Sequence, residues 1–309
     1  MFPITSKINP LVSAEILRVN VVSLIARLAV CVMVIAVFTP PLLALEPIPD
    51  KLVVLTFDDS VKSHITVVRP ILKKHGFGGT FYITEGFDFK ENKESYLTWE
   101  EIAFLHRDGF EIGNHTRDHM GCTKKNLSKI KEQLDAINDR CAEYDIPKPT
   151  TFAYPGNAFD DGAIPILEEA GIQFARRGGS PEYSYQKDRG KGFGYEPGRD
   201  HPLLVPSAGD ARPDWTLDDF KRAASMAKEG KIAILQFHGV PEVEHPWVHT
   251  PVVRFQEYMQ YLKDEGYTVI AMRDLAKYVD PKTQRPDDLW EVISKRKAKL
   301  AKEKPTEEE

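Results

Sequence analysis

Residues 51–57 read Lys-Leu-Val-Val-Leu-Thr-Phe, and two carboxylates, Asp58 and Asp59, follow at once. A nearly continuous apolar run of this length is typical of a strand that is buried on both faces, as in a parallel sheet. His64 to His75 then carries apolar residues at helical spacing, and Gly79 to Ile83 is again strand-like. The segment therefore predicts a strand, a helix and a second strand, which is the repeating unit of a parallel α/β fold.

The same alternation continues along the chain. Further strands are predicted at residues 110–113, 152–154, 174–176, 203–205, 232–237 and 268–272. Further helices are predicted near residues 126–143, 160–170, 216–228 and 252–265, and another helix opens at residues 98–101. Seven or eight strands within about 235 residues favour a (β/α) barrel over an open sheet. The long Gly-rich and Pro-rich segment Gly178 to His201 interrupts this rhythm and predicts a surface loop or lid.

The N-terminus has the pattern of an export signal. Leu28 to Phe38 is uncharged, Arg18 and Arg27 precede it, and Ala44 offers a small residue for cleavage. The alternative is an uncleaved anchor formed by the wider run Val21 to Leu45. In either case we expect the rest of the chain to lie outside the cytoplasm, whether secreted, periplasmic or anchored.

Charge and composition divide the 309 residues into three parts. Residues 1–44 form the signal peptide or anchor, residues 45–280 the barrel, and residues 281–309 a nearly all-polar tail predicted as a solvated helix that leads into a disordered end. The formal net charge is −5, with +2 on residues 1–44 and −7 on the remainder. An acidic body argues against nucleic-acid binding, which needs a basic face.

Candidate catalytic groups follow three of the predicted strands. Asp58 and Asp59 come after the first strand, His115 and His119 after the third, and His238 after the penultimate one. In a parallel barrel the carboxyl ends of the strands gather on one face. Two imidazoles and a carboxylate suit zinc or a similar metal, and the second carboxylate can accept a proton. Taken singly, each group is more simply a turn, a solvated pair or a core residue.

These residues resemble the motifs of a known family, the polysaccharide deacetylases or NodB-homology carbohydrate esterases. The matching segments are Thr56–Asp59 (TFDD), His115–His119 (HTRDH), Phe152–Gly156 (FAYPG) and Leu235–His238 (LQFH), in the family's order. The resemblance covers roughly Lys51 to Asp280. It implies a distorted (β/α)7 barrel of NodB-homology type.

The resemblance also implies a role for each matched residue. Asp59, His115 and His119 would hold a divalent metal, typically Zn²⁺. Asp58 would be the general base and His238 the general acid. Tyr154 and Gly156, in the third motif, would face the substrate, and a backbone N–H near Gly156 would stabilise the oxyanion.

The chain departs from the family pattern after the acidic pair and in the third motif. Ser60 stands where a glycine is usual, and Ala153 stands where an arginine usually orients the base. Arg176, Arg177 and Arg199 are the candidates to replace that arginine.

Two further assignments concern the edge of the site. The family's fourth motif, an Asp-Trp pair beside the catalytic histidine, is matched by Asp214-Trp215, which can equally be the residues that precede a helix. His245, Trp247 and His249 lie in a Pro-bounded loop and are candidates for substrate contact at the rim of the barrel.

The expected function is therefore metal-dependent hydrolysis of acetyl groups from an exported or cell-wall carbohydrate, at N-acetyl amides or O-acetyl esters. Two alternatives remain open. The same site can act on another C–N bond, in a formamido-sugar or a cyclic imide, or the chain can bind carbohydrate without catalysis. The expected partner is an acetylated carbohydrate, and the membrane is expected to be involved only through an uncleaved N-terminal segment.

Overall fold

The computed structural model describes residues 44–184, 187–188, 190–283, 285 and 288–303. The predicted export segment falls on residues that lie, apart from Ala44, outside this described part. Among the described residues, no helix has the length and apolar character needed to cross a membrane.

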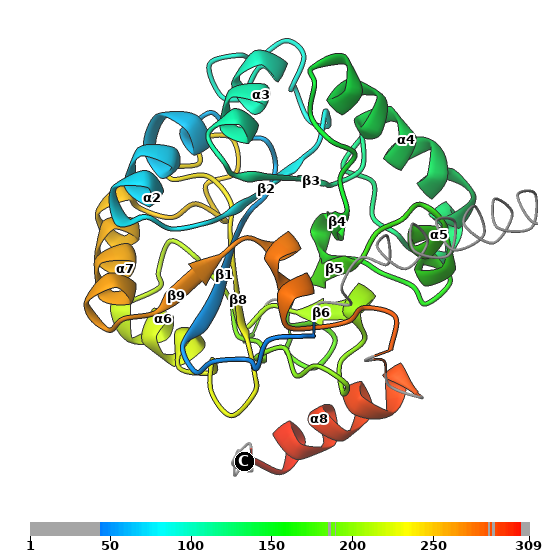
Figure 1. Cartoon of the computed structure of the whole chain (residues 1–309), viewed down its shortest axis with the longest axis vertical. Coiled ribbons are helices and arrows are strands. Elements are labelled where there is room, and N and C mark those ends of the chain that lie inside the picture. Colours follow the sequence, from blue (N-terminus) through cyan, green and yellow to red (C-terminus); the bar gives the residue numbers. More distant parts are fainter. Residues whose placement is uncertain (1–43, 185–186, 189, 284, 286–287, 304–309) are drawn as a thin grey trace, which may run out of the picture. The chain divides into compact units, whose positions relative to one another are not determined.

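Nine strands of the described chain form one parallel sheet at the centre of the fold (Figure 1). Their order is β6-β5-β4-β3-β2-β1-β8-β7, and β9 pairs with β1 as well. The strands are β1 (Leu52–Phe57), β2 (Thr80–Ile83), β3 (Glu111–Asn114), β4 (Thr151–Ala153), β5 (Phe174–Arg177), β6 (Val205–Pro206), β7 (Gly209–Asp210), β8 (Ala233–Phe237) and β9 (Thr268–Ile270).

Helices α2 to α7 surround this sheet (Figure 1). They are α2 (Arg69–His75), α3 (Trp99–Arg107), α4 (Leu127–Glu143), α5 (Ala163–Glu169), α6 (Leu217–Ala224) and α7 (Val252–Asp264). Capping boxes begin two of them, Thr98 with Glu101 at α3 and Thr216 with Asp219 at α6. The predicted distorted (β/α)7 barrel is confirmed. The two-residue strand β7 was not predicted, because so short a strand has no recognisable hydrophobic period.

The first strand, β1, is buried on both faces. Val53, Leu55 and Phe57 belong to a hydrophobic cluster with residues of α2 and α7, whereas Leu52 and Val54 belong to a second cluster with residues of β5 and β6. Successive side chains of a strand point to opposite faces, so a strand between two apolar layers needs an unbroken apolar run. This requirement explains the run at residues 51–57. β1 pairs with three strands because β9 pairs with its first half (Leu52–Val54) and β2 with its end (Thr56 and Phe57), while β8 pairs along Val53–Phe57.

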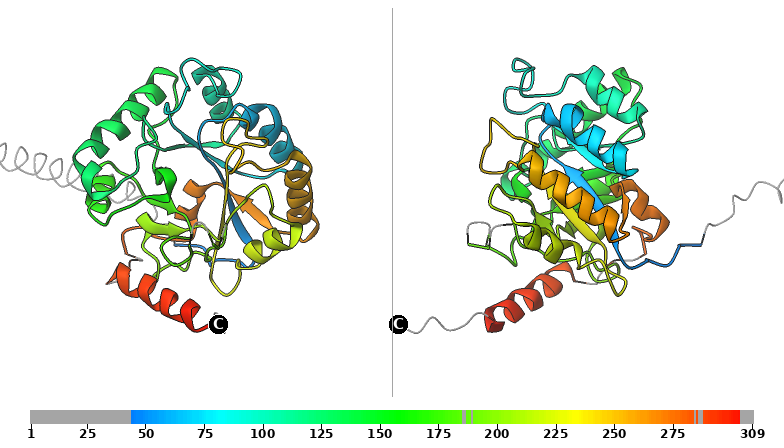
Figure 2. Two further views of the ribbon diagram at one scale, coloured as in Figure 1. Left: turned by 180° about the vertical axis from the view of Figure 1, so that it is seen from behind. Right: turned by 90° about the vertical axis from the view of Figure 1, so that its left-hand side faces the viewer.

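The C-terminal region contains a helix. This helix, α8 (Leu289–Glu303), lies at the edge of the molecule outside the ring of the other helices (Figures 1 and 2). The helix expected in this tail is therefore present. Among its described side chains only those of Ile293 and Arg296 are buried, so one face of α8 packs on the barrel.

The turn after β1 has an unusual backbone. Asp59 and Ser60 both adopt positive φ, at 72° and 56°. Glycine reaches this region at little cost, whereas residues with a Cβ are strained there. Ser60 gains compensating bonds, because its hydroxyl donates to the carbonyl of Thr84 at 2.8 Å and accepts from the Thr84 N–H at 2.9 Å. A serine can thus stand where the family has glycine.

We predict that Ser60→Ala lowers the free energy of unfolding by about 2 kcal/mol, because it leaves buried groups of Thr84 unpaired. Ser60→Gly loses the same bonds but relieves the backbone strain, so it should cost about 1 kcal/mol less than Ser60→Ala. Denaturant unfolding of the two variants and the parent measures both values. Equal stability of the two variants would contradict the strain argument.

Candidate metal and catalytic site

The carboxyl ends of several strands converge on one pocket of about 190 Å³. Asp58 and Asp59 follow β1, His115 follows β3, and His238 follows β8. All four line this pocket, together with His119 from the loop after β3. The residues predicted from the sequence to be metal ligands, base and acid therefore lie around one cavity.

Three of these side chains form a compact group. Asp59 Oδ1 lies 3.4 Å from His115 Nε2 and 3.3 Å from His119 Nε2. Among the described residues this is the one cluster of His, Cys and carboxylate groups in which three ligand atoms lie within 4.8 Å of one another. His115 Nδ1 lies 2.7 Å from the carbonyl oxygen of Ala153. A carbonyl only accepts, so Nδ1 carries the proton and the Nε2 lone pair faces Asp59.

The donor set fits a divalent metal. Two neutral imidazoles and one carboxylate are typical ligands of zinc and of non-haem iron or cobalt sites, and three protein ligands leave positions open for water or substrate. Asp59 Oδ1 is buried and has no hydrogen-bond donor, which is costly unless a cation or water binds there. Burial raises the pKa of Asp59, but protons on the facing nitrogens of His115 and His119, whose place a metal would take, outweigh burial and hold it well below its usual range. The carboxylate is thus ionised and able to bind a metal.

The second carboxylate, Asp58, is held by a buried arginine. Arg176 Nη2 donates to Asp58 Oδ2 at 2.5 Å, and the side chains are 0% and 2% exposed. Gln236 Nε2 donates to the same oxygen at 3.2 Å. The other oxygen, Oδ1, is buried without a partner and is thus available to accept a proton. Of the other two candidate arginines, Arg177 pairs with Glu182 and the exposed Arg199 pairs with Glu196.

His238 lies between carboxylates. Its Nε2 is 3.9 Å from Oδ2 of both Asp58 and Asp59, and its Nδ1 is 3.8 Å from Asp210 Oδ1. Asp210 is in turn hydrogen-bonded to Arg212. A carboxylate in this position can orient the imidazole ring.

The acid beside His238 is therefore Asp210, and the prediction of Asp214-Trp215 for this place is wrong. Asp214 is exposed, and Trp215 is a core residue whose ring packs against Gly209. Sequence reasoning missed Asp210 because β7 is only two residues long. The register of the sheet shows why Asp210 lies here, since it pairs with Gln236, two residues before His238.

A buried histidine supports the backbone at His238. His64 Nε2 lies 3.2 Å from the His238 carbonyl oxygen, to which it must donate. Burial lowers the pKa of His64 to about 4, so this imidazole is neutral at physiological pH. Its role is to hold the chain after β8 rather than to titrate.

The third-motif residues contribute differently to the pocket wall. The Tyr154 hydroxyl donates to the Leu203 carbonyl at 2.8 Å, and the Tyr154 N–H donates to the Arg176 carbonyl at 3.0 Å. Both donors of Tyr154 are thus already engaged. Gly156 has φ +59° and open space where a Cβ would stand, so a ligand can approach its backbone closely.

Backbone strain concentrates around the pocket. Nine residues other than glycine have positive φ in the described chain, and six of them lie in or next to the site. Such conformations cost free energy and persist where the surrounding structure enforces them, which is common at functional sites. The six residues are Asp59, Ser60, Phe87, Thr116, His119 and Asn157.

Aromatic side chains form one rim of the pocket. The Phe87 ring lies 4.6 Å from the ring of His119 and 4.5 Å from that of His245, and Trp247 lies 5.3 Å from His245. Phe87 and Trp247 are 44% and 57% exposed. Glu242 interacts with His245 and raises its pKa. His245 and Trp247 thus lie at the pocket, as expected for rim residues, whereas His249 is absent from its lining.

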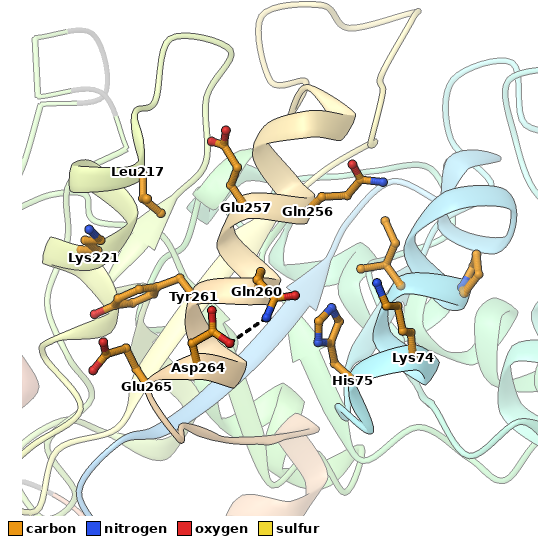
Figure 3. Close-up of a pocket in the computed structure, with 12 residues that line it drawn as sticks. Lys74, His75, Leu217, Lys221, Gln256, Glu257, Gln260, Tyr261, Asp264 and Glu265 are labelled. Atoms are coloured by element: carbon orange, nitrogen blue, oxygen red, sulfur yellow. Dashed lines mark hydrogen bonds between the residues drawn. The ribbon is translucent and has the colours of Figure 1, made fainter.

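A larger groove of about 820 Å³ lies elsewhere, between the outer helices α2, α6 and α7 (Figure 3). Lys74 and His75 of α2 face Gln260 of α7, whereas Tyr261 of α7 lies on the α6 side, beside Lys221. Its lining residues come from helix surfaces rather than from strand ends, and the metal-ligand cluster described above is not part of it. Size alone therefore does not identify the active site.

Comparison with known proteins agrees with this geometry. A family profile described as polysaccharide deacetylase matches residues 46–175. This match and the relatives described below support a polysaccharide deacetylase domain in this part of the chain. The match includes β1 to β4 and the first two residues of β5, and hence Asp58, Asp59, His115 and His119.

Individual relatives are more distant. The chain is 33% identical over 91 residues to the peptidoglycan-N-acetylmuramic acid deacetylase PdaA of Bacillus subtilis, covering 29% of this chain and 32% of the relative. It is 26% identical over 128 residues to the peptidoglycan-N-acetylglucosamine deacetylase of Bacillus cereus, covering 41% and 56%. The alignments thus span about one-third to just over half of these relatives' lengths.

A solved structure shares the fold. The family 4 acetyl xylan esterase from Clostridium thermocellum, in complex with a cobalt ion, aligns with a TM-score of 0.50 and 22% identity, covering 76% of this chain and 97% of that one. At this identity the likeness concerns the barrel only.

The change in the third motif has a structural explanation. Ala153 on β4 and Arg176 on β5 are register partners in the parallel sheet. The arginine that this chain lacks at position 153 is therefore supplied from the neighbouring strand, at the same level of the barrel. Its guanidinium reaches the carboxylate that the family's arginine is expected to orient.

We predict that Arg176→Met lowers the free energy of unfolding by about 3–5 kcal/mol, because Asp58 stays buried without its cation. In an Asp58→Asn background the same substitution should cost far less, since no buried charge is left unpaired. Arg199→Met, at an exposed arginine, is the control and should change stability by about 0.5 kcal/mol or less. A full cost in both backgrounds, measured by denaturant unfolding, would contradict the ion-pair account.

Proposed function

We propose that this protein is a metal-dependent hydrolase that removes acetyl groups from a carbohydrate. The observation that carries the proposal is the arrangement of five side chains in one pocket. Asp59, His115 and His119 converge as potential metal ligands, while Asp58 and His238 face the same space from β1 and β8. A non-catalytic binding protein has no need of the last two.

Asp58 and His238 divide the proton transfers in this proposal. Asp58, held by Arg176, accepts a proton from the attacking water through its unpartnered Oδ1. His238, which lies between Asp210, Asp58 and Asp59, gives a proton to the departing amine or alcohol. The reaction consumes water and the acetyl amide or ester, and it forms acetate and a free amine or hydroxyl. The proton that Asp58 takes up is matched by the proton that His238 gives.

Asp59, His115 and His119 would hold the divalent metal. When bound, it supplies Lewis-acid polarisation of the acetyl carbonyl and eases the ionisation of water. The N–H of Gly156, at the open part of the wall, is suited to donate to the oxyanion. Two imidazoles and one carboxylate suit zinc and other divalent metals alike.

A carbohydrate substrate is supported by the aromatic rim. Phe87 and Trp247 expose large apolar faces beside the pocket, and such faces suit the flat apolar side of a sugar ring. Two relatives are named as peptidoglycan deacetylases, which makes an exported cell-wall polymer the first substrate to test. An extracytoplasmic location, directed by residues 1–44, is part of the same proposal and would be tested by finding the chain in the exported fraction.

We predict that Asp58→Asn reduces acetate release from acetylated peptidoglycan, chitin or xylan by about 10²–10⁴-fold while metal content is retained. Asp59→Ala should lose metal and activity together. Asp214→Asn, at the exposed aspartate, is the control and should keep both. A formamido-sugar is assayed in parallel, and faster release of formate from it than of acetate from the acetylated substrates would favour the formamido-sugar alternative. Metal loss in Asp58→Asn but not in Asp59→Ala would reverse the two roles.

We also predict that Trp247→Ala raises KM for an acetylated oligosaccharide by about tenfold, with little change for a small aryl acetate, because only the oligosaccharide reaches the rim. Val243→Ala is the matched control, since Val243 is exposed in the same loop but is not part of the pocket lining. Equal KM values for Trp247→Ala and the parent on the oligosaccharide would remove Trp247 from substrate binding.

A further inference from the structure

The C-terminal helix α8 is attached to the barrel by a buried arginine. Arg296 is 7% exposed, and its two terminal nitrogens donate to the two oxygens of Asp200 at 2.5 and 2.8 Å. Its guanidinium also lies 4.9 Å from the ring of Phe193. Bidentate pairs of this kind are strong and geometrically specific. A solvated tail would not need one.

Arg296 is one member of a four-residue charge network. Its Nη1 lies 3.7 Å from Glu182 Oε1, and Glu182 in turn accepts from Arg177 at 2.7 and 2.8 Å. The side chains of Arg177, Glu182, Asp200 and Arg296 are all less than 10% exposed. Two cations and two anions balance in the interior, so removal of Arg296 leaves two buried carboxylates to share one arginine.

This network fixes both ends of the long loop that follows β5. Glu182 lies near the start of residues 178–201 and Asp200 at the end, so Arg296 connects the two. The loop reaches the active site in between, where the carbonyl of Gly190 accepts the N–H of Asp210 at 3.0 Å. Asp210 is the carboxylate beside His238.

The network also adjoins the residue that holds the base. Arg177, the partner of Glu182, is the direct neighbour of Arg176 at the end of β5. Arg176 is bonded to Asp58 and lies 3.4 Å from the Asn157 side chain. Gly178, the next residue, has the Asn157 side chain where its Cβ would stand. The start of the loop is therefore packed against the layer that surrounds the catalytic pocket.

We propose that α8 is part of the catalytic domain as a positioning element, and that Arg296 is a positioning residue that holds loop 178–201 against the active site. The proposal rests on the proposed function in one respect, that Asp58 and His238 act in catalysis. It assigns to the C-terminal region an effect on turnover, although no residue of α8 is part of the pocket lining.

The test compares Arg296→Ala with Lys295→Ala in the full chain. Lys295→Ala removes the same charge from the adjacent position of α8. The Lys295 side chain is exposed and, among the ion pairs described, pairs only with Glu291. The first readout is the rate of trypsin cleavage after Lys187, an exposed residue of the loop, followed by mass spectrometry. The second is kcat and KM for a small aryl acetate, which does not depend on the rim.

We expect Arg296→Ala to speed cleavage after Lys187 and to lower kcat by about tenfold with KM nearly unchanged. Lys295→Ala should match the parent in both readouts, and Arg296→Lys, which keeps the charge, should recover part of kcat. Should Arg296→Ala fail to fold, Arg296→Met with Asp200→Asn removes one charge of each sign and replaces it in the same assays.

Unchanged cleavage, or faster cleavage with unchanged kcat, overturns the proposal, as does an equal loss of kcat in Lys295→Ala. Failure of the proposed function is distinguishable, because the parent itself would then release no acetate. In that case the cleavage readout still decides whether Arg296 holds the loop, while the effect on turnover is overturned with the function.

Discussion

Two carboxylates on consecutive residues are buried in one pocket, and much of the site is organised to make that possible. Asp58 and Asp59 are 2% and 5% exposed. Ionised groups this close repel each other, and burial removes the water that would screen them. Each therefore has its own source of positive charge or donors. Asp58 has the Arg176 guanidinium, and Asp59 has two imidazoles and the place where a metal would bind.

The parallel barrel suits this requirement because it gathers strand ends that are far apart in the sequence. The compensating groups come from β3, β5 and β8, and Asp210 comes from β7. The turn after β1 adopts a left-handed backbone at Asp59 and Ser60 as the chain leaves the strand. The hydrogen bonds of Ser60 to Thr84, after β2, offset part of that strain. The strain and the charges are both stabilised by contacts from neighbouring strands.

Much of the fold could be predicted from the sequence, because long apolar runs and helical periods report burial directly. The run at residues 51–57, the α4 pattern and the capping box at Thr98 are of this kind. The carboxylates and imidazoles after β1 and β3 were also predictable, because they occur in compact local motifs. The packing of α8 was not, since a helix with mostly charged residues gives no sign that Arg296 has buried partners on a loop about a hundred positions earlier.

The residues that local spacing could not settle are Arg176 and Asp210, and both follow from sheet register. A motif specifies a position along one strand, whereas the barrel specifies a level that neighbouring strands share. Ala153 and Arg176 occupy the same level on β4 and β5, and Asp210 pairs with Gln236 on β7 and β8. A side chain on the adjacent strand at the same level can thus reach the partner of the residue it replaces, as Arg176 on β5 reaches Asp58 in place of a residue at position 153. An arginine can therefore be lost from a motif while its charge stays in the site, and a missing motif residue is better sought across the sheet than along the chain.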